Sequence, residues 1–216
     1  MLRVAMDASY PPFAVAETSG AVVGFNVQLA HAIAAELGVK TQVINISDDG
    51  LRDALIADKA DAVISQIQPL RAFRLLYSVP YYNAGLVLVV PRGSQLQPDP
   101  AALRGRPVGV EWGGSADEWI HAHRQLGIHV DRFETTADAM KALEAGQVAT
   151  VLTDAPQAAL ALRHNGALRV LSPPLTSRPY VVAVAPQNKS LIKAIDSAIE
   201  TLKTDGNLQQ IISTYI

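Results

Sequence analysis

The stretch Leu2-Arg3-Val4-Ala5-Met6-Asp7 (LRVAMD, residues 2–7) opens the pattern that decides the fold, because it reads as a short buried strand. A helical period follows over NVQLAHAIAAELG (26–38), and TQVINI (41–46) reads as a second strand. A short helix around residues 51–55 and a third strand over 60–67 complete the series. This βαβαβ order predicts a mostly parallel sheet covered by helices.

The same order of elements recurs in the second half of the chain. Strands are predicted over 107–112, 128–133 and 149–153. The helices between them begin near Ser115, at Thr136 and after Asp154. The first of these helices is expected to bury four side chains, which are Trp119, Ile120, His123 and Leu126.

The recurrence predicts an α/β protein with two Rossmann-like lobes rather than one. We expect lobe 1 to hold residues 1–86 and 182–216, and lobe 2 to hold residues 87–181. Two extended apolar segments, 84–90 and 178–185, carry the chain between the lobes. The final helices, over 190–203 and 208–215, are expected to pack back on lobe 1. Ligands of open α/β sheets sit beyond the carboxyl ends of the strands, which predicts a cleft between the lobes.

Composition excludes several classes of function. The 216 residues carry 18 basic and 20 acidic side chains, so no basic field exists to hold nucleic acid or an anionic membrane. Hydrophobic residues make up 49%, which excludes intrinsic disorder, and no apolar run approaches the ~18 residues that span a bilayer. The absence of cysteine removes thiolate metal sites and cysteine nucleophiles, and no histidines have ligand spacing. We therefore expect no metal and no cofactor.

The first residues lack the pattern of a targeting leader, since Met1 to Asp7 runs directly into a strand. Two interpretations stay open at this point. The protein is cytoplasmic, or the chain is a mature form with an added start methionine.

Two candidate groups follow strands of the first half. In Asp7-Ala8-Ser9-Tyr10-Pro11-Pro12-Phe13, Tyr10 offers an aromatic face and Asp7 a carboxylate, unless the prolines merely stiffen a loop. After the third strand come Ser65 and Arg71, and a guanidinium at that place can bind a carboxylate with two hydrogen bonds. Arg74 is the competing candidate one helical turn away, and a solvated surface arginine is the plainer alternative.

Two further groups follow strands of the second half. Gly113-Gly114-Ser115 between a strand and a helix lets an anion approach free N–H groups, although Ser115 could equally be a helix cap. The spacing fits neither a Walker loop nor a dinucleotide fingerprint. Asp154 could face the cleft as the counter-ion of an ammonium group, or it could cap a helix whose first turn holds Pro156. No nucleophile elbow is present.

Taken in order along all 216 residues, these signals resemble the family 3 extracellular solute-binding proteins, the amino-acid receptors of bacterial ABC importers. The resemblance rests on seven stretches: 7–13 (DASYPPF), 23–30 (VGFNVQLA), 60–65 (ADAVIS), 78–82 (SVPYY), 151–156 (VLTDAP) and 204–206 (TDG), together with Gly113-Gly114-Ser115. It implies two lobes that close like a flytrap on an amino acid. It also implies a monomer that works at the periplasmic or extracellular face of the membrane and delivers its ligand to a transporter permease.

The resemblance implies a role for each candidate. Arg71 would clamp the ligand carboxylate, helped by the N–H groups and hydroxyl at Ser115. Asp154 would pair with the ammonium, helped by the carbonyl of Ser65, and Tyr10 would cover the ligand side chain. Since the chain is about two residues shorter than the usual pattern between Ser65 and Arg71, Gln68 is expected to replace one ammonium contact.

Two departures from the family pattern, Asp48 and Glu111, concern the ligand side chain. Asp7, Asp48 and Glu111 could place up to three carboxylates around one pocket. Unpaired carboxylates in a closing cleft would repel one another, and a cationic ligand would relieve this. We therefore expect a basic amino acid, arginine or lysine. The alternative is that Asp48 only caps the next helix and Glu111 turns to water.

Binding without chemistry is the leading expectation, so the protein is not expected to be an enzyme. The alternative is an enzyme on the same scaffold, similar to the cyclohexadienyl dehydratases, with Glu111 or Glu134 as the acid. A third interpretation is the ligand-sensing domain of a receptor.

Overall fold

The computed structural model describes residues 1–69, 74–163 and 165–216, and it divides the chain into two compact units. Unit 1 comprises Met1–Tyr82 and Pro179–Ile216, and unit 2 comprises Asn83–Arg178. The sequence analysis expects boundaries a few residues further along the chain, after residues 86 and 181. Each unit is an α/β layer structure, which confirms the predicted fold class.

Unit 1 is built on a five-stranded sheet with helices on both faces. The strands, in spatial order, are β5 (Thr41–Asn45), β1 (Leu2–Met6), β6 (Ala62–Val63), β15 (Ala183–Val184) and β7 (Leu76–Tyr77). The helices are α1 (Phe25–Glu36), α2 (Asp48–Ile56), α6 (Lys189–Thr204) and α7 (Asn207–Tyr215). A small antiparallel sheet, inserted before α1, joins β2 (Ser9–Tyr10), β3 (Ala14–Ala16) and β4 (Val22–Val23).

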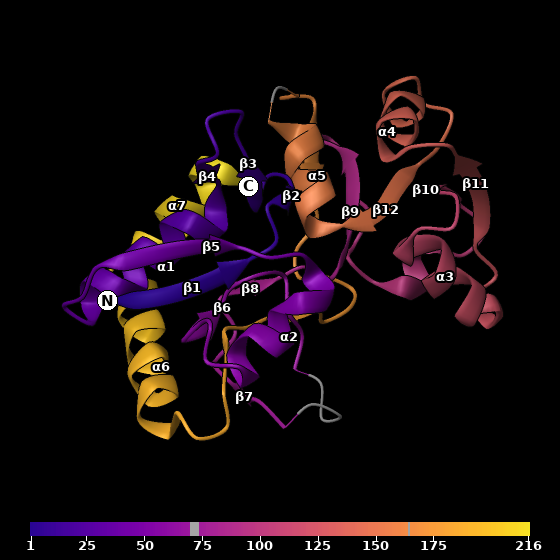
Figure 1. The fold of residues 1–216 in the computed structure, drawn as a ribbon. Helices are drawn as coiled ribbons and strands as arrows, with labels where there is room; N and C mark the ends of the chain where they lie inside the picture. Colours follow the sequence, from indigo (N-terminus) through magenta and orange to yellow (C-terminus); the bar gives the residue numbers. More distant parts are fainter. Residues whose placement is uncertain (70–73, 164) are drawn as a thin grey trace. The chain divides into compact units, whose positions relative to one another are not determined.

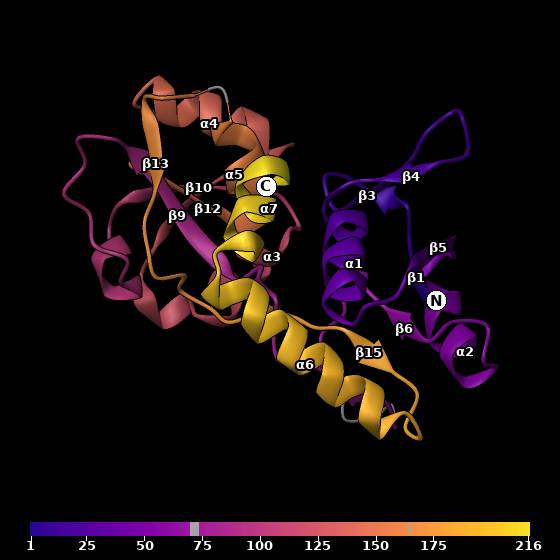
Figure 2. The ribbon, with the colours of Figure 1, turned by 90° about the vertical axis from the view of Figure 1, so that its left-hand side faces the viewer.

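Unit 2 repeats this sheet strand for strand. Its strands, in spatial order, are β11 (His129–Phe133), β10 (Pro107–Glu111), β12 (Thr150–Asp154), β9 (Leu86–Pro91) and β13 (Leu168–Val170). Its helices are α3 (Ser115–Ala122), α4 (Thr136–Glu144) and α5 (Ala155–Leu162), with short 3-10 turns at Pro100–Leu103 and Arg124–Leu126. Strands β8 (Tyr82–Asn83) and β14 (Pro179–Tyr180) pair where the chain passes between the units. The elements can be followed in Figures 1 and 2.

The sheets are less parallel than the βαβαβ pattern predicts. In unit 1, β1 runs parallel to β5 and β6, whereas β15 runs antiparallel to both of its neighbours. In unit 2, β10 runs parallel to β11 and β12, whereas β9 is antiparallel to its neighbours. The antiparallel pairs arise because β15 and β9 belong to the segments of chain that cross between the units. They do not follow a neighbouring strand through a strand–helix–strand connection, which would make them parallel.

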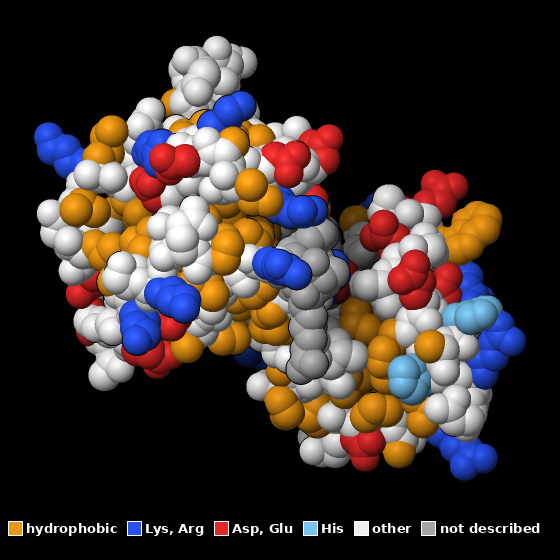
Figure 3. Space-filling view, turned by 60° about the horizontal axis from the view of Figure 1, so that its bottom comes forward, with side chains coloured by type: hydrophobic (Ala, Val, Ile, Leu, Met, Phe, Trp, Pro, Cys, Tyr) orange, Lys and Arg blue, Asp and Glu red, His pale blue; other side chains and the backbone are white. Residues whose placement is uncertain are grey.

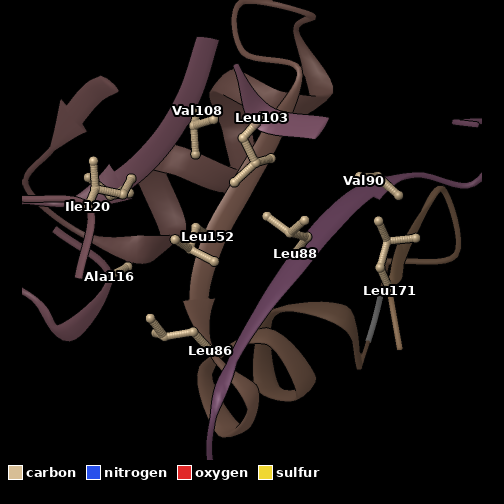
Figure 4. Close-up of a cluster of buried hydrophobic side chains, with 10 residues drawn as sticks. Leu86, Leu88, Val90, Leu103, Val108, Ala116, Ile120, Leu152 and Leu171 are labelled. Atoms are coloured by element: carbon tan, nitrogen blue, oxygen red, sulfur yellow. The ribbon is translucent and has the colours of Figure 1, made fainter. Parts of the chain in front are cut away.

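The core of unit 2 follows from the alternation along β9. Leu86, Leu88 and Val90 point to one face, where they pack with Ile120 of α3 and with Leu103 (Figure 4). Val87 and Val89 point to the other face, where they pack with buried residues of α4 and α5. A strand that is buried on both faces needs a continuous apolar run, and residues 86–90 supply one.

Helices also pack on the sheet of unit 1. Leu51, Ala54 and Leu55 of α2 pack on one face of its sheet, as their spacing predicts. Helices α6 and α7 contact α1, and α6 also contacts β15 and β7. The final helices therefore return to unit 1, which confirms that expectation.

Several local predictions are wrong. The third strand is only β6 at Ala62–Val63, not 60–67. Helix α3 ends at Ala122, so Leu126 lies in a 3-10 turn, and Trp119 and His123 are only partly buried. These two rings instead stack on each other with their centroids 4.4 Å apart.

Asn26 does not cap α1, because Gly24 holds that position. The carbonyls of Pro12 and Phe13 accept the N–H groups of Phe25 and Asn26, at 3.2 and 2.8 Å. A Cβ on Gly24, which has φ of 127°, would lie 2.6 Å from the Phe13 oxygen, so only glycine fits this close approach. The loop before α1 therefore caps the helix with its own backbone.

The surface carries mixed charge. Acidic and basic side chains are interspersed on the face drawn in Figure 3, in keeping with a net charge of −2. In the described part of the chain, no helix combines the length and apolar composition needed to cross a bilayer. Among the same residues, no three His, Asp or Glu side chains are grouped to hold a metal ion.

Candidate functional site

Asp7, directly after β1, is held by three donors within unit 1. Its carboxylate accepts the Ser9 hydroxyl at 2.6 Å, the Ser9 N–H at 2.9 Å and the Asp48 N–H at 2.9 Å. The Ser9 hydroxyl lowers the pKa of Asp7 most, and the two N–H groups add to this against the opposing effect of burial. Because Asp48 is the first residue of α2, Asp7 caps that helix from a distant point in the sequence.

In unit 2, Glu111 likewise binds the start of a helix. It ends β10, the counterpart of β1, and its carboxylate accepts the N–H and the hydroxyl of Thr136 at 3.1 and 2.7 Å. Thr136 is the first residue of α4, so this carboxylate also lies at the positive end of a helix. The premise that Asp7 and Glu111 are unpaired is therefore wrong. Glu111 does not simply turn to water either.

Asp48 differs from both. Its residue is exposed, Ser47 occupies the N-cap position of α2, and the described residues offer its carboxylate no hydrogen bond or ion pair. The interpretation of Asp48 as the cap of α2 is therefore wrong. With Gln66 and Gln68, Asp48 lines a cavity of about 290 Å³ in unit 1. The structure thus brings together two of the predicted residues, Asp48 and Gln68.

The remaining candidates of unit 1 lie in different surroundings. Tyr10 is 49% exposed, with its ring centroid 6.2 Å from that of Phe13, so much of this residue is open to solvent. Ser65 is buried and its hydroxyl accepts the N–H of Asp7 at 3.2 Å, which ties two predicted residues together. Arg71 lies outside the described residues. Arg74 is exposed.

In unit 2, the Gly113–Ser115 turn is fixed by a residue that the sequence analysis does not single out. Gly113 has φ of 69° and donates its N–H to Asp117 at 3.1 Å. Asp117 is buried and forms an ion pair with Arg132, whose Nη2 lies 2.9 Å from Oδ1. The guanidinium of Arg132 lowers the pKa of Asp117, and the Gly113 N–H adds to this effect. The acidic first turn of α3 was the available sequence signal.

The start of α3 leaves backbone donors available. Ser115 is the first residue of the helix, with Gly114 as the N-cap, so the alternative that Ser115 is only a helix cap is wrong. The N–H groups of Ser115 and Ala116 have no acceptor among the described residues, as expected for the first turn of a helix. An anion can approach them because Gly113 and Gly114 carry no side chains.

The Ser115 hydroxyl instead donates to Asp154 Oδ2 at 2.6 Å. Asp154 ends β12 and stands at the N-cap position of α5, but its side chain makes no capping hydrogen bond. Its other oxygen, Oδ1, lies 3.4 Å from Nη1 of Arg178, another residue that the sequence analysis does not single out. Free N–H donors and a carboxylate therefore meet at Ser115, an arrangement complementary to a carboxylate and an ammonium group on one small molecule.

Known proteins resemble this chain over nearly its whole length. The family model for bacterial extracellular solute-binding proteins, family 3, matches residues 2–216. The L-cystine-binding protein TcyJ of Escherichia coli K12 is 30% identical over 96% of this chain and 79% of its own. The L-arginine-binding protein of Pseudomonas aeruginosa is 28% identical over 99% of this chain and 87% of its own. Both relatives are named for the amino acid that they bind, and a further relative from Escherichia coli K12, 27% identical over 97% of this chain and 88% of its own, is named ABC transporter arginine-binding protein 1.

Solved structures show the same fold. An ancestral arginine-binding protein bound to arginine has 30% identity and a TM-score of 0.59, covering 100% of this chain and 97% of its own. A substrate-binding protein of a polar amino acid uptake transporter from Streptococcus thermophilus has a TM-score of 0.88 at 22% identity, covering 100% and 85%. The chain belongs to the family 3 bacterial extracellular solute-binding proteins.

Proposed function

We propose that this protein reversibly binds an α-amino acid and delivers it to the permease of an ABC importer. The observation that carries the proposal is the meeting at Ser115 of two unpartnered N–H groups and the Asp154 carboxylate. The α-carboxylate of the ligand would accept hydrogen bonds from the start of α3, and its ammonium would pair with Asp154. Because one carbon joins these two groups in an amino acid, a single ligand can satisfy both.

The contrast between α1 and α3 supports this assignment. The two helices are counterparts, since each connects the first two parallel strands of its unit. At α1, the carbonyls of Pro12 and Phe13 already accept the first N–H groups. At α3, the corresponding donors have no acceptor among the described residues. Of these two helix starts, the one in unit 2 is suited to an anion.

We propose that Arg71 supplies the second hold on the carboxylate. Replacement of a guanidinium that clamps a buried carboxylate costs about 2–5 kcal/mol of binding free energy, or a few decades in affinity. Arg71→Ala should show this loss, whereas Arg74→Ala is the matched control with one arginine removed three residues away. Loss of binding in Arg74→Ala but not in Arg71→Ala would contradict the assignment.

We propose a basic amino acid as the ligand, on narrower grounds than the sequence suggests. Asp7 and Glu111 have partners, so the free carboxylate of Asp48 carries the argument, with Tyr10 as an open aromatic face. A guanidinium or ammonium would give this carboxylate its counter-ion. An arginine-binding and a probable histidine-binding protein are among the relatives, as is a cystine-binding protein. The family supports a monomer working at the periplasmic or extracellular face of the membrane.

Titration calorimetry tests the ligand class. We expect arginine or lysine to bind more tightly than glutamine, glutamate or cystine, and Asp48→Asn to reduce this preference. Asp49→Asn, one residue along α2, is the matched control for charge. Tighter binding of glutamine, glutamate or cystine than of both basic amino acids would refute the basic ligand but leave amino-acid binding in place.

A further inference from the structure

The Asp154 carboxylate is not an empty acceptor. Its Oδ2 atom accepts the Ser115 hydroxyl at 2.6 Å, and its Oδ1 atom faces Nη1 of Arg178 at 3.4 Å. A hydroxyl has one hydrogen to donate, and Ser115 commits it to Oδ2. Each carboxylate oxygen can accept two hydrogen bonds, so Oδ2 keeps one acceptor position, while Oδ1, whose contact with Arg178 is long, is the less occupied oxygen. Arg178 thus faces the oxygen that is more open to an incoming ammonium group.

The side chain of Arg178 can move away from Asp154 without a change in its backbone. Its backbone is fixed, because its N–H donates to the Asn83 side chain at 2.8 Å and its carbonyl accepts the Ala84 N–H at 2.9 Å. Its side chain is 42% exposed, and the contact with Oδ1 is long for a charged hydrogen bond. Water can therefore solvate the guanidinium when it leaves Asp154, while the backbone at Arg178 stays in place.

We propose that Arg178 is an internal competitor that occupies the ammonium acceptor in the free protein and is displaced by the α-ammonium of the ligand. The proposal rests on the assignment of Asp154 under the proposed function and deepens it. Two cations on one carboxylate repel, so the ligand binds Asp154 fully only after the guanidinium has moved. Arg178 thus weakens the affinity for every ligand that carries an α-ammonium, whatever its side chain. Such a residue favours release of the ligand to a transporter.

The size of the effect follows from the exposure of the pair. Partly exposed ion pairs of this kind are worth a small fraction of a decade to somewhat less than one decade in an equilibrium constant. Arg178→Ala should therefore tighten binding by about two- to fivefold. A residue that only supported the structure would weaken binding when removed, so the direction of the change separates the two roles.

Calorimetry at low ionic strength tests the proposal with arginine, lysine, histidine, glutamine and cystine as probes, on the wild type and four variants. Arg178→Ala should bind more tightly each probe that the wild type binds. Arg106→Ala, which removes an exposed arginine of the same unit, should leave affinity within twofold. Asp154→Asn should weaken binding, and adding Arg178→Ala to it should change affinity less than twofold, because no charged acceptor is left to compete for.

The outcomes separate the two claims. If Asp154→Asn weakens binding while Arg178→Ala weakens it too or leaves it unchanged, the competitor role is refuted and the proposed function stands. If Asp154→Asn has no effect, or no probe binds the wild type, the proposed function fails and the competitor role fails with it. Thermal unfolding of every variant confirms that the compared proteins are folded.

Discussion

Replacing Asp117 with alanine is expected to lower the free energy of unfolding by about 2 kcal/mol and to weaken amino-acid binding. Two losses add up to this figure. The ion pair with Arg132, whose side chain is 45% exposed, is worth no more than about 1 kcal/mol. The hydrogen bond from the Gly113 N–H to a charged oxygen adds about 1 kcal/mol, which is less than the roughly 1.5–3 kcal/mol usual for a charged acceptor because Gly113 is exposed and can be rehydrated.

Urea unfolding and calorimetry measure the two effects. Glu118→Ala is the matched control, since it removes another acidic side chain from the first turn of α3 and the same favourable interaction with the helix dipole. We expect its unfolding free energy to change by less than about 0.5 kcal/mol. Equal losses in the two variants would mean that the dipole, not the contacts to Arg132 and Gly113, explains the role of Asp117. Unchanged binding in Asp117→Ala would refute the role of the Gly113 turn in the site.

Two further predictions concern unit 1. Asp7→Ala removes the carboxylate that caps α2 and should cost about 1–2 kcal/mol at pH 7 by urea unfolding. Because the folded protein lowers the pKa of Asp7, this stabilisation is fully present above the pKa of the unfolded chain, about 4, and is lost as the pH falls through the lower pKa of the folded protein. An equal loss of unfolding free energy in Asp7→Ala at pH 7 and at pH 2 would contradict this explanation. Gly24→Ala forces a Cβ to within 2.6 Å of a carbonyl oxygen and should cost at least about 2 kcal/mol, whereas Gly93→Ala, with no atom near its Cβ, should change stability by less than about 0.5 kcal/mol. Similar thermal shifts in the two glycine variants would refute the close approach.

Local periodicity was enough to predict most elements of the fold. The alternation over residues 86–90 and the spacing of Leu51, Ala54 and Leu55 each reflect burial against neighbouring layers, and both appear in the cores as expected. The long-range contacts at helix starts could not be predicted in this way. The first N–H group of α2 is bound by Asp7, 41 positions away, and that of α4 by Glu111, 25 positions away, although Thr135 also caps α4 locally. Such partners become adjacent only when parallel strands align.

The candidate site shows the same limit. The motif around Ser115 and the carboxylate of Asp154 could be found from the sequence, because each follows a predicted strand. Their hydrogen bond, and the approach of Arg178 to Asp154, depend on contacts between β12, α3 and the end of unit 2. The number of acidic residues also overestimated the free carboxylates available to a ligand. The carboxylates of Asp7 and Glu111 each accept a hydrogen bond from the first N–H group of a helix.

The central claim is that this protein recognises the ammonium and carboxylate groups of a free α-amino acid. A thermal-shift screen of the twenty amino acids and cystine tests it most directly. A ligand that binds only the folded state stabilises it by about 4 kcal/mol at a thousandfold excess over Kd. We predict that at least one amino acid raises the melting temperature and that its N-acetyl and carboxamide derivatives do not. No shift with any amino acid, or an equal shift with the N-acetyl derivative, would contradict the claim.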